Sequence, residues 1–255
     1  MLSKICVAIL DDHQSIIDGF TYRLSMDPAI RIVATAIYGE ELEPMLANHA
    51  VDVLLLDVSI PNSPEDHNPY PVLHIIPGLL QKYPGLNILI ISMFTQRSLI
   101  EALVRTGISG YIFKDDQPSI QQLDKIVRTI GNGGVYFSEG AHWEPQGQGP
   151  DSVLTPRQLE ALSLCASCPD GDTVLLAKEL GVTSSTLRNL LSGSYLRLGV
   201  RTRAAAIARA HQLGLLPEKP ELNLVAGNVI KKPSGKHNPR NPKRARNKAP
   251  SVKPV

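Results

Sequence analysis

The sequence predicts an α/β domain with a doubly wound, five-stranded parallel sheet, followed by an all-α domain of four helices and a basic tail. Five short runs rich in Val, Ile and Leu alternate with helix-like stretches over the first 130 residues, and strands buried on both faces have this composition. The pattern turns helical throughout between Leu154 and Leu216. The tail from Pro217 differs again, and residues 231–255 hold five prolines, many cations and almost no large apolar side chains.

The strand-like runs are separated by segments with recognisable helix signals. The first helix ends before Asp27-Pro28, and the fourth ends at Gly107. Parallel strands joined by helices form right-handed crossovers, which generate a doubly wound sheet. The predicted strands are 5–10, 30–37, 51–57, 86–92 and 110–114, and the predicted helices are 14–26, 40–49, 72–83, 97–106 and 119–131.

The second domain is predicted to contain two short helices joined by a sharp turn. Gly181 permits the turn, and Thr183 is a suitable N-cap for the helix that follows. In such a helix-turn-helix unit the second helix enters the major groove of DNA, and its N-terminal residues reach the base edges. The four predicted helices are 156–167, 173–180, 184–197 and 202–213.

The net charge of +2 conceals a strong asymmetry along the chain. Residues 1–150 carry 9 Lys and Arg against 17 Asp and Glu, whereas residues 222–255 carry 9 Lys and Arg and no acid. A basic end favours a polyanionic partner. The predicted boundaries are 1–132 for the α/β domain, 133–152 for a Gly-, Pro- and Gln-rich linker, 153–216 for the helical domain and 217–255 for a disordered tail.

Composition also argues against several other classes of protein. No apolar run reaches the roughly 18 residues that a membrane span needs. The short apolar run near the N-terminus is followed by Asp11 and Asp12 and lacks a small-residue cleavage site, which argues against a signal peptide. Three cysteines provide no disulfide framework. We therefore expect a cytoplasmic protein with no membrane partner.

Polar side chains follow four of the predicted strands at the points where these strands end. They are Asp11 and Asp12, Asp57, Ser92 and Lys114. Ligands of open α/β sheets bind at this edge, where the strand order reverses. Three carboxylates there repel one another unless a divalent cation such as Mg²⁺, which prefers oxygen ligands, lies between them.

This arrangement suits a carboxylate that accepts a phosphoryl group. Asp57 is the predicted nucleophile, Lys114 pairs with a phosphoryl oxygen, and the Ser92 hydroxyl donates a hydrogen bond to another. Each residue also has a simpler interpretation. Asp11 or Asp12 can cap the first helix, Lys114 alone can be a surface charge, and Tyr111 alone can be a half-buried strand residue.

The same residues resemble the receiver domain of bacterial response regulators over about residues 3–130. The resemblance rests on Asp11-Asp12, Asp57, Pro61, Ser92 and Gly110-Tyr111-Ile112-Phe113-Lys114. It implies a flavodoxin-like fold, a Mg²⁺ cofactor and a sensor histidine kinase as phosphodonor. It also implies that Ser59 supplies a backbone carbonyl to the metal and that Tyr111 swings inward as a switch.

The chain departs from the receiver pattern after Pro61. The segment up to Val72 is about five residues longer than usual and carries three further prolines. Because it lies beside Asp57, the extra length can alter kinase docking or the lifetime of the phosphoryl group. The alternative is a tolerated surface insertion, which costs little closure entropy.

The helical domain resembles the LuxR-type output domain of NarL/FixJ-class regulators. Matching segments are Leu154–Arg157, Leu176–Asn189, Tyr195–Val200 and His211–Leu216. The chain departs from this pattern in a loop about two residues longer at Ser167–Asp172 and in Leu190. A further departure is Gly193, which costs roughly 1 kcal/mol relative to Ala inside a helix.

The predicted recognition helix and its surroundings supply candidate DNA contacts. Arg188 and Asn189 are the predicted base readers, because Arg suits guanine and Asn suits adenine. The alternative for any single Arg is a solvated surface charge. On the face opposite Leu187, Leu190 and Leu191 lie Ser185, Arg188, Asn189 and Ser192, and the predicted phosphate contacts are Thr186, Arg197, Arg201 and Arg203. The basic tail either adds salt-sensitive attraction to DNA or is a solvating extension.

Together these patterns predict a response regulator transcription factor. Phosphorylation of Asp57 is expected to favour a homodimer whose two helix-turn-helix units bind double-stranded DNA. The protein is then a switch and not a turnover enzyme. One alternative is a constitutive DNA-binding protein whose receiver is a phosphorylation-independent dimerisation module. A phosphatase is disfavoured because Ser59 stands where such enzymes need a second acid.

Overall fold

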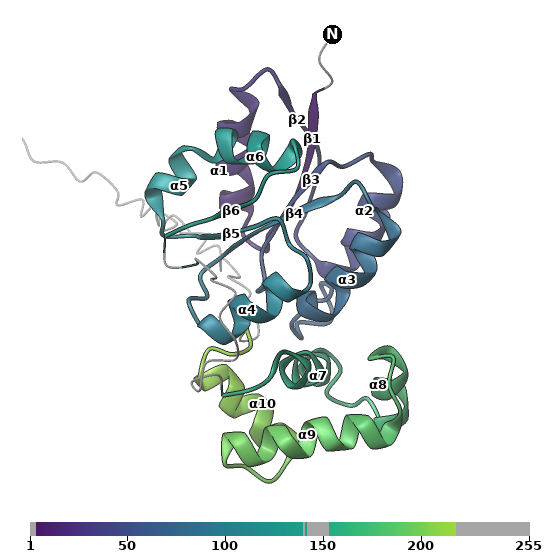
Figure 1. Cartoon of the computed structure of the whole chain (residues 1–255). Coiled ribbons are helices and arrows are strands. Elements are labelled where there is room, and N and C mark those ends of the chain that lie inside the picture. Colours follow the sequence, from purple (N-terminus) through teal and green to yellow (C-terminus); the bar gives the residue numbers. More distant parts are fainter. Residues whose placement is uncertain (1–3, 140, 142–152, 218–255) are drawn as a thin grey trace, which may run out of the picture. The chain divides into compact units, whose positions relative to one another are not determined.

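The computed structural model describes residues 4–139, 141 and 153–217 (Figure 1). We call residues 4–139 with 141 the sheet domain, and residues 153–217 the helical domain. Most of the predicted linker and all of the predicted tail beyond Pro217 lie outside the described residues. No helix in the described ranges combines the length and the apolar character that crossing a membrane requires.

The sheet domain is built on a parallel sheet with the strand order β2-β1-β3-β4-β5-β6. The order reverses between β1 and β3, which makes this the switch point at which doubly wound sheets bind ligands. The strands are β1 Ile5–Leu10, β2 Ile30–Ala36, β3 Val53–Leu56, β4 Asn87–Ser92, β5 Gly110–Phe113 and β6 Tyr136–Phe137.

The sheet has six strands in the described residues, so the prediction of five was wrong. The sixth, β6, lies within the segment predicted as linker from residue 133. It pairs with β5 because the Tyr136 amide donates to the Ser109 carbonyl and the Ser138 amide donates to the Tyr111 carbonyl. A strand of only two residues, Tyr136 and Phe137, shows too little apolar periodicity to be recognised from the sequence.

The helices of the sheet domain follow the predicted ranges with two differences. The predicted helix 119–131 is two helices, which meet at Gln122. The predicted helix 40–49 begins with a short 3-10 turn, η1. The bounds are α1 Gln14–Ser25, η1 Gly39–Glu41, α2 Leu42–Asn48, α3 Val72–Lys82, α4 Arg97–Arg105, α5 Gln117–Gln121 and α6 Leu123–Gly131.

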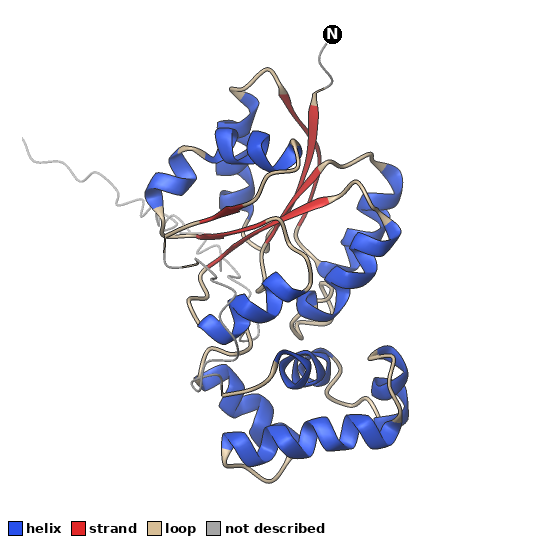
Figure 2. Ribbon diagram, in the orientation of Figure 1, coloured by secondary structure: helices blue, strands red, loops and turns tan. Residues whose placement is uncertain are grey.

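Helices cover both faces of the sheet (Figure 2). Alternate strand residues belong to two separate apolar clusters, one on each face. Val7, Ile9 and Leu55 pack against α1 and α6, whereas Leu10 and Leu56 pack on the side of α2, α3 and α4. Successive side chains of a strand face opposite ways, so a sheet covered on both sides needs apolar residues at every position. The central strands therefore consist almost entirely of aliphatic residues.

The helical domain consists of α7 Pro156–Ser167, α8 Thr173–Glu179, α9 Ser184–Leu198 and α10 Arg203–Gln212. Each helix begins after a residue whose side chain accepts a backbone amide of the first turn, namely Thr155, Asp172, Thr183 and Thr202. Gly181, at φ +67°, forms the turn between α8 and α9. These features confirm the predicted helical domain.

The glycine inside α9 has a structural reason that the sequence did not reveal. A Cβ atom added to Gly193 would lie 2.6 Å from Nε2 of Gln158. The Gln158 side chain belongs to the capping box that starts α7, and α7 packs against α9. Glycine thus leaves space for the Gln158 side chain beside α9, which offsets part of its low helix propensity.

The helix α7 also packs against α3 and α4 of the sheet domain. It is buried around most of its circumference, from Leu159 to Ser167. Only one side of α7 faces its own domain, so the other side is covered by the sheet domain. One continuous apolar cluster consequently includes residues from both domains.

Gly110 provides a test of the packing between β5 and β6. A Cβ atom at this position would lie 2.4 Å from the backbone oxygen of Tyr136 and 2.9 Å from a methyl carbon of Leu89. We predict that Gly110→Ala lowers the free energy of unfolding by about 1–3 kcal/mol, because overpacking forces the strands apart. Urea unfolding measures this, with Gly85→Ala as the control, since no atom lies within 4 Å of its added Cβ. Equal midpoints for the two variants would contradict the prediction.

Candidate functional site

The backbone ladder of the sheet brings the predicted polar residues to one edge. The Asp57 amide donates to the Leu10 carbonyl at 3.0 Å, which places Asp57 beside Asp11. The Lys114 amide donates to the Ser92 carbonyl at 2.9 Å. Since β1, β3, β4 and β5 are parallel, all four residues leave the sheet at the same end, next to the switch point.

Lys114 joins the two buried carboxylates of this edge. Its Nζ atom lies 2.6 Å from Oδ2 of Asp11 and 2.8 Å from Oδ2 of Asp57. Asp11 is 2% exposed and Asp57 is 5% exposed, so the three charges interact with little screening. Burial opposes the charged form of Lys114, but the Asp57 and Asp11 carboxylates outweigh it and raise the pKa of Lys114. Lys114 is therefore a cation under all ordinary conditions.

The negative charge of the edge is only partly neutralised by Lys114. Burial and the nearby Asp57 raise the pKa of Asp11, and Lys114 only partly opposes them. Burial also raises the pKa of Asp12, although His13 opposes it. Carboxylates that resist ionisation indicate a place for additional positive charge. Their oxygen donors fit Mg²⁺, which Asp11, Asp12 and Asp57 would hold together with the carbonyl of Ser59.

The histidine after the acidic pair, His13, belongs to the same cluster, although no sequence pattern selects it. Nδ1 of His13 lies 2.6 Å from Oδ1 of Asp12, and the His13 amide donates to Oδ1 of Asp11. Ligand atoms of Asp11, Asp12 and His13 lie within 4.8 Å of one another. The N-cap of α1 is His13 itself, without a side-chain cap bond, so neither aspartate caps that helix.

Ser92 and Tyr111 are both fully buried near the same edge of the sheet. Ser92 is fully buried, and the described residues offer its hydroxyl no hydrogen-bond partner. Burying a hydroxyl without a hydrogen-bond partner lowers the stability of the fold unless another group supplies that bond. Tyr111 is fully buried as well, and its hydroxyl donates to the Phe94 carbonyl at 2.7 Å. Burial raises the pKa of Tyr111, so its hydroxyl stays protonated.

The predicted recognition helix, α9, presents the expected polar face. Leu187, Leu191 and Leu198 are buried against the rest of the helical domain. The predicted base-reading and neighbouring residues are all exposed, namely Ser185, Thr186, Arg188, Asn189, Ser192 and Arg197. The hydroxyls of Ser185 and Thr186 lie 2.8 and 2.9 Å from the N-cap hydroxyl of Thr183.

The two arginines after α9 differ in their surroundings. Arg201 is exposed, whereas Arg203 is half-buried and donates to the Gly171 carbonyl at 2.6 Å. Arg203 thus ties the loop before α8 to the start of α10, and this bond competes with its predicted phosphate contact. Leu196 was not predicted to have a role, yet it is 84% exposed and lies four residues after Ser192, on the same face of α9.

Comparison with known proteins agrees with this geometry. Residues 7–128 match the response regulator receiver domain family. The transcriptional regulatory protein DegU of Brevibacillus brevis is 25% identical over 238 residues, which cover 83% of this chain and 95% of DegU. The transcriptional regulatory protein DesR of Bacillus subtilis (strain 168) is 26% identical over 211 residues, which cover 82% of this chain and 98% of DesR.

Solved structures show the same fold over both domains. The structure of RcsB from Salmonella enterica serovar Typhimurium bound to promoter rprA in the presence of BeF3⁻ has a TM-score of 0.56 at 20% identity. It covers 82% of this chain and 99% of the RcsB chain. Residues 7–128 thus form a response regulator receiver domain, and the chain as a whole is similar to transcriptional regulatory proteins of the response regulator type.

The bridging position of Lys114 gives the second prediction. Lys114→Met leaves Asp11 and Asp57 facing each other without a cation, and removing one member of a buried charge cluster typically costs about 3–5 kcal/mol. We expect a lower melting temperature for Lys114→Met in a metal-free buffer and a partial recovery when Mg²⁺ is added. Lys125→Met is the control, because Lys125 is exposed on α6. A Lys114→Met protein as stable as the control, or insensitive to Mg²⁺, would refute the assigned role.

Proposed function

We propose that this chain is a transcription factor in which phosphorylation of Asp57 by a sensor histidine kinase controls DNA binding by α9. One observation carries the proposal above the others. A buried carboxylate at the switch point lies within 2.8 Å of a buried lysine, beside a buried serine hydroxyl that lacks a partner. The same chain presents an exposed cationic helix in a second domain.

The chemistry at Asp57 is a phosphoryl transfer. A carboxylate oxygen of Asp57 forms a bond to phosphorus while the P–N bond of the kinase phosphohistidine breaks, and the departing imidazole keeps the electron pair. Lys114 is placed to neutralise charge on the transferred group, since it already contacts Asp57. When bound, Mg²⁺ would supply further charge neutralisation at the acidic edge.

Ser92 and Tyr111 are proposed to report the phosphoryl group to the rest of the molecule. The Ser92 hydroxyl gains a partner when a phosphoryl oxygen is present, which removes the cost of leaving it unpaired. The inward position of Tyr111 is held by its bond to Phe94, two residues after Ser92. Movement of Ser92 therefore alters the loop to which Tyr111 is attached, and the population of this state shifts.

The DNA contacts follow from the exposed face of α9. Arg188 and Asn189 are proposed to read bases, whereas Thr186, Arg197 and Arg201 are proposed to contact phosphates with Ser185 and Ser192 beside them. Arg203 is proposed to contact a phosphate only when its hydrogen bond to the Gly171 carbonyl is broken. The solved relative RcsB is bound to promoter DNA in its structure. The basic segment 222–255 is proposed to add salt-sensitive attraction.

Two further features complete the proposal. The phosphorylated chain is proposed to act as a homodimer, because two helix-turn-helix units one helical turn apart match two half-sites. The chain is proposed to work in the cytoplasm, where both a kinase and the genome are accessible. DegU and DesR are each named transcriptional regulatory proteins, which supports the same role here.

The role of Asp57 gives the third prediction. Treatment of the full chain with acetyl phosphate and Mg²⁺ should raise its DNA affinity and its dimer fraction, and Asp57→Asn should abolish both increases. Asp18→Asn, an exposed aspartate on α1, should behave like the unmodified sequence. Fluorescence anisotropy and analytical ultracentrifugation measure the two quantities. A response that survives in Asp57→Asn would instead favour a receiver that only dimerises, without phosphorylation control.

The fourth prediction separates base reading from phosphate contact. Arg188→Ala should weaken binding to a selected operator by about 1–3 kcal/mol, and binding to random DNA should fall much less. Arg209→Ala, which removes an exposed arginine from α10, should affect both DNAs little. An equal loss on both DNAs for Arg188→Ala would mean that this side chain contacts only phosphate.

A further inference from the structure

The long segment after β3, residues 61–71, forms a hydrogen-bonded hairpin. Pro61 and Pro69 form an antiparallel bridge, and the Asn62 amide donates to the Asn68 carbonyl at 2.9 Å. Inside the resulting hairpin, the Asp66 carboxylate accepts hydrogen bonds from the side chains of Asn62 and Asn68. These bonds hold the loop, residues 61–71, in one conformation.

This loop contacts the C-terminal end of α7 in the helical domain. The Ser167 hydroxyl donates to the Pro69 carbonyl at 2.6 Å, and the Asn62 side chain donates to the Ser167 carbonyl at 3.3 Å. Ser167 is 7% exposed, so this exchange of hydrogen bonds takes place away from water. Both sheet-domain residues in this exchange, Asn62 and Pro69, belong to the loop 61–71.

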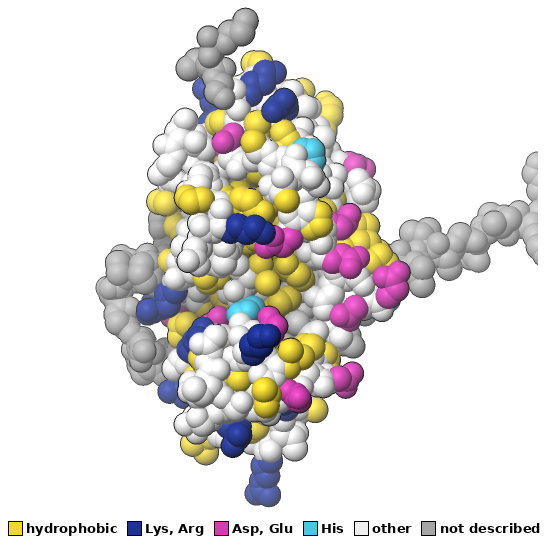
Figure 3. Space-filling model, turned by 90° about the vertical axis from the view of Figure 1, so that its right-hand side faces the viewer, with side chains coloured by type: hydrophobic (Ala, Val, Ile, Leu, Met, Phe, Trp, Pro, Cys, Tyr) yellow, Lys and Arg dark blue, Asp and Glu magenta, His cyan; other side chains and the backbone are white. Residues whose placement is uncertain are grey.

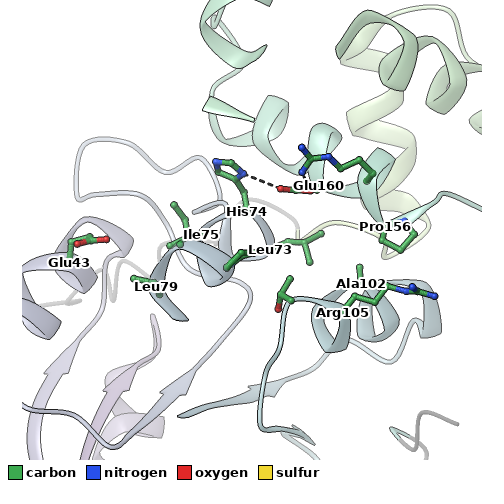
Figure 4. A pocket seen from close by; sticks show the side chains of 13 residues that line it. Glu43, Leu73, His74, Ile75, Leu79, Ala102, Arg105, Pro156 and Glu160 are labelled. Carbon is green, nitrogen blue, oxygen red and sulfur yellow. Dashed lines mark hydrogen bonds and ion pairs between the residues drawn. The ribbon is translucent and has the colours of Figure 1, made fainter. Parts of the chain in front are cut away.

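A second polar contact joins the same face of α7 to α3. Nδ1 of His74 lies 3.2 Å from Oε1 of Glu160, and Figure 4 shows the two side chains pointing toward each other. Glu160 and Ser167 are seven residues apart, so they lie on one face of α7 about 10 Å apart along its axis. The α7 helix is thus held near both of its ends.

Each polar group of α7 in this contact has a second partner within its own domain. Ser167 can turn its hydroxyl to the Ser163 carbonyl, at 3.1 Å, and Glu160 keeps its ion pair with Arg157. Asn62 likewise keeps its bond to Asp66. After separation of the two domains, the Ser167 hydroxyl, Glu160 and Asn62 would each keep a partner, so breaking the polar part of the contact costs little.

Two open pockets border these contacts. A cavity of about 550 Å³ lies between α3, α4 and α7, and Figure 3 shows one face of the molecule hollowed, with apolar side chains between charged ones. Another cavity, of about 530 Å³, separates Asn68 and Pro69 of the loop from Ile207 and His211 of α10. Permanent interfaces pack as densely as protein interiors.

Two segments of the sheet domain that contact the helical domain follow shortly after residues of the phosphorylation site. The loop starts four residues after Asp57, and it leads directly into α3, which carries His74. The segment after Ser92 contains Gln96, whose side chain lies against Gly214, since a Cβ atom there would be 2.2 Å from its Nε2 atom. A shift of either strand end would therefore move a segment that contacts the helical domain.

We propose that the loop 61–71 and His74 form a reversible clasp on Glu160 and Ser167 of α7, which holds the helical domain until Asp57 is phosphorylated. This deepens the proposed function and rests on it. The clasp grips α7 and leaves the polar face of α9 exposed. The clasp therefore restricts the orientation of α9 without covering its surface. Release of the clasp allows two chains to align their α9 helices on adjacent half-sites of DNA.

The test uses Ser167→Ala in the full chain, because alanine keeps the helix and removes only the hydroxyl. Amide hydrogen exchange is measured for residues 61–71 and for α7, with and without Mg²⁺ and BeF3⁻. Loss of one hydrogen bond should speed exchange of the loop about fivefold without the phosphoryl mimic, and the mimic should have the same effect on the unmodified sequence. Replacement of residues 62–68 by two glycines should have the same effect on α7, and Ser163→Ala, one turn earlier on α7, should not.

The result separates the clasp from the proposed function. Exchange in Ser167→Ala that matches Ser163→Ala overturns the clasp, whatever happens at Asp57. Fast exchange in Ser167→Ala together with no effect of BeF3⁻ on the unmodified sequence would keep the contact and overturn its control by phosphorylation. Small-angle scattering gives an independent measure, since release of the clasp should increase the radius of gyration of the chain.

Discussion

The salt bridges from Lys114 to Asp11 and Asp57 are the interaction on which the rest of the structure depends. They place a cation between two carboxylates that are almost fully buried, at the point where the strand order of the sheet reverses. Without it, the aliphatic strands would end in uncompensated negative charge. The same bridge gives the site its chemistry, because a carboxylate kept beside a lysine in a poorly hydrated pocket can accept a phosphoryl group.

The contact between the two domains combines apolar packing with a few polar pairs. A helix that contacted the sheet domain only through large aliphatic side chains would not separate from it in water. The α7 helix meets the sheet domain within a continuous apolar cluster, to which Ser167 and Glu160 add polar contacts with Pro69 and His74. The DNA-facing side of α9 is exposed at the same time, so the described structure combines a restrained domain with an accessible recognition surface.

Most of the fold could be predicted because its strands are buried on both faces. Runs such as Val53–Leu56 have no polar alternation, and the polar residue after each run marks the functional edge. β6 escaped prediction because its pairing with β5 depends on backbone bonds and not on an apolar run. The division of the predicted helix 119–131 at Gln122 has no signal in the sequence, because Gln is itself a good helix former.

Side-chain partners were harder to predict than positions. Asp57, Ser92 and Lys114 were placed correctly at one edge, but the bridge from Lys114 to Asp11 and the part played by His13 depend on geometry that spacing does not give. The bond between Arg203 and Gly171 and the contact between Ser167 and Pro69 join residues 32 and 98 positions apart. Such pairs form only after the elements have packed, and no local pattern records them.

The most direct test of the central claim is the mass of the full chain after treatment with acetyl phosphate and Mg²⁺, followed by peptide mapping. We expect one phosphoryl group per chain, on the peptide that contains Asp57, and its loss in Asp57→Asn. A chain that never gains this mass, or gains it on another residue, would contradict the account.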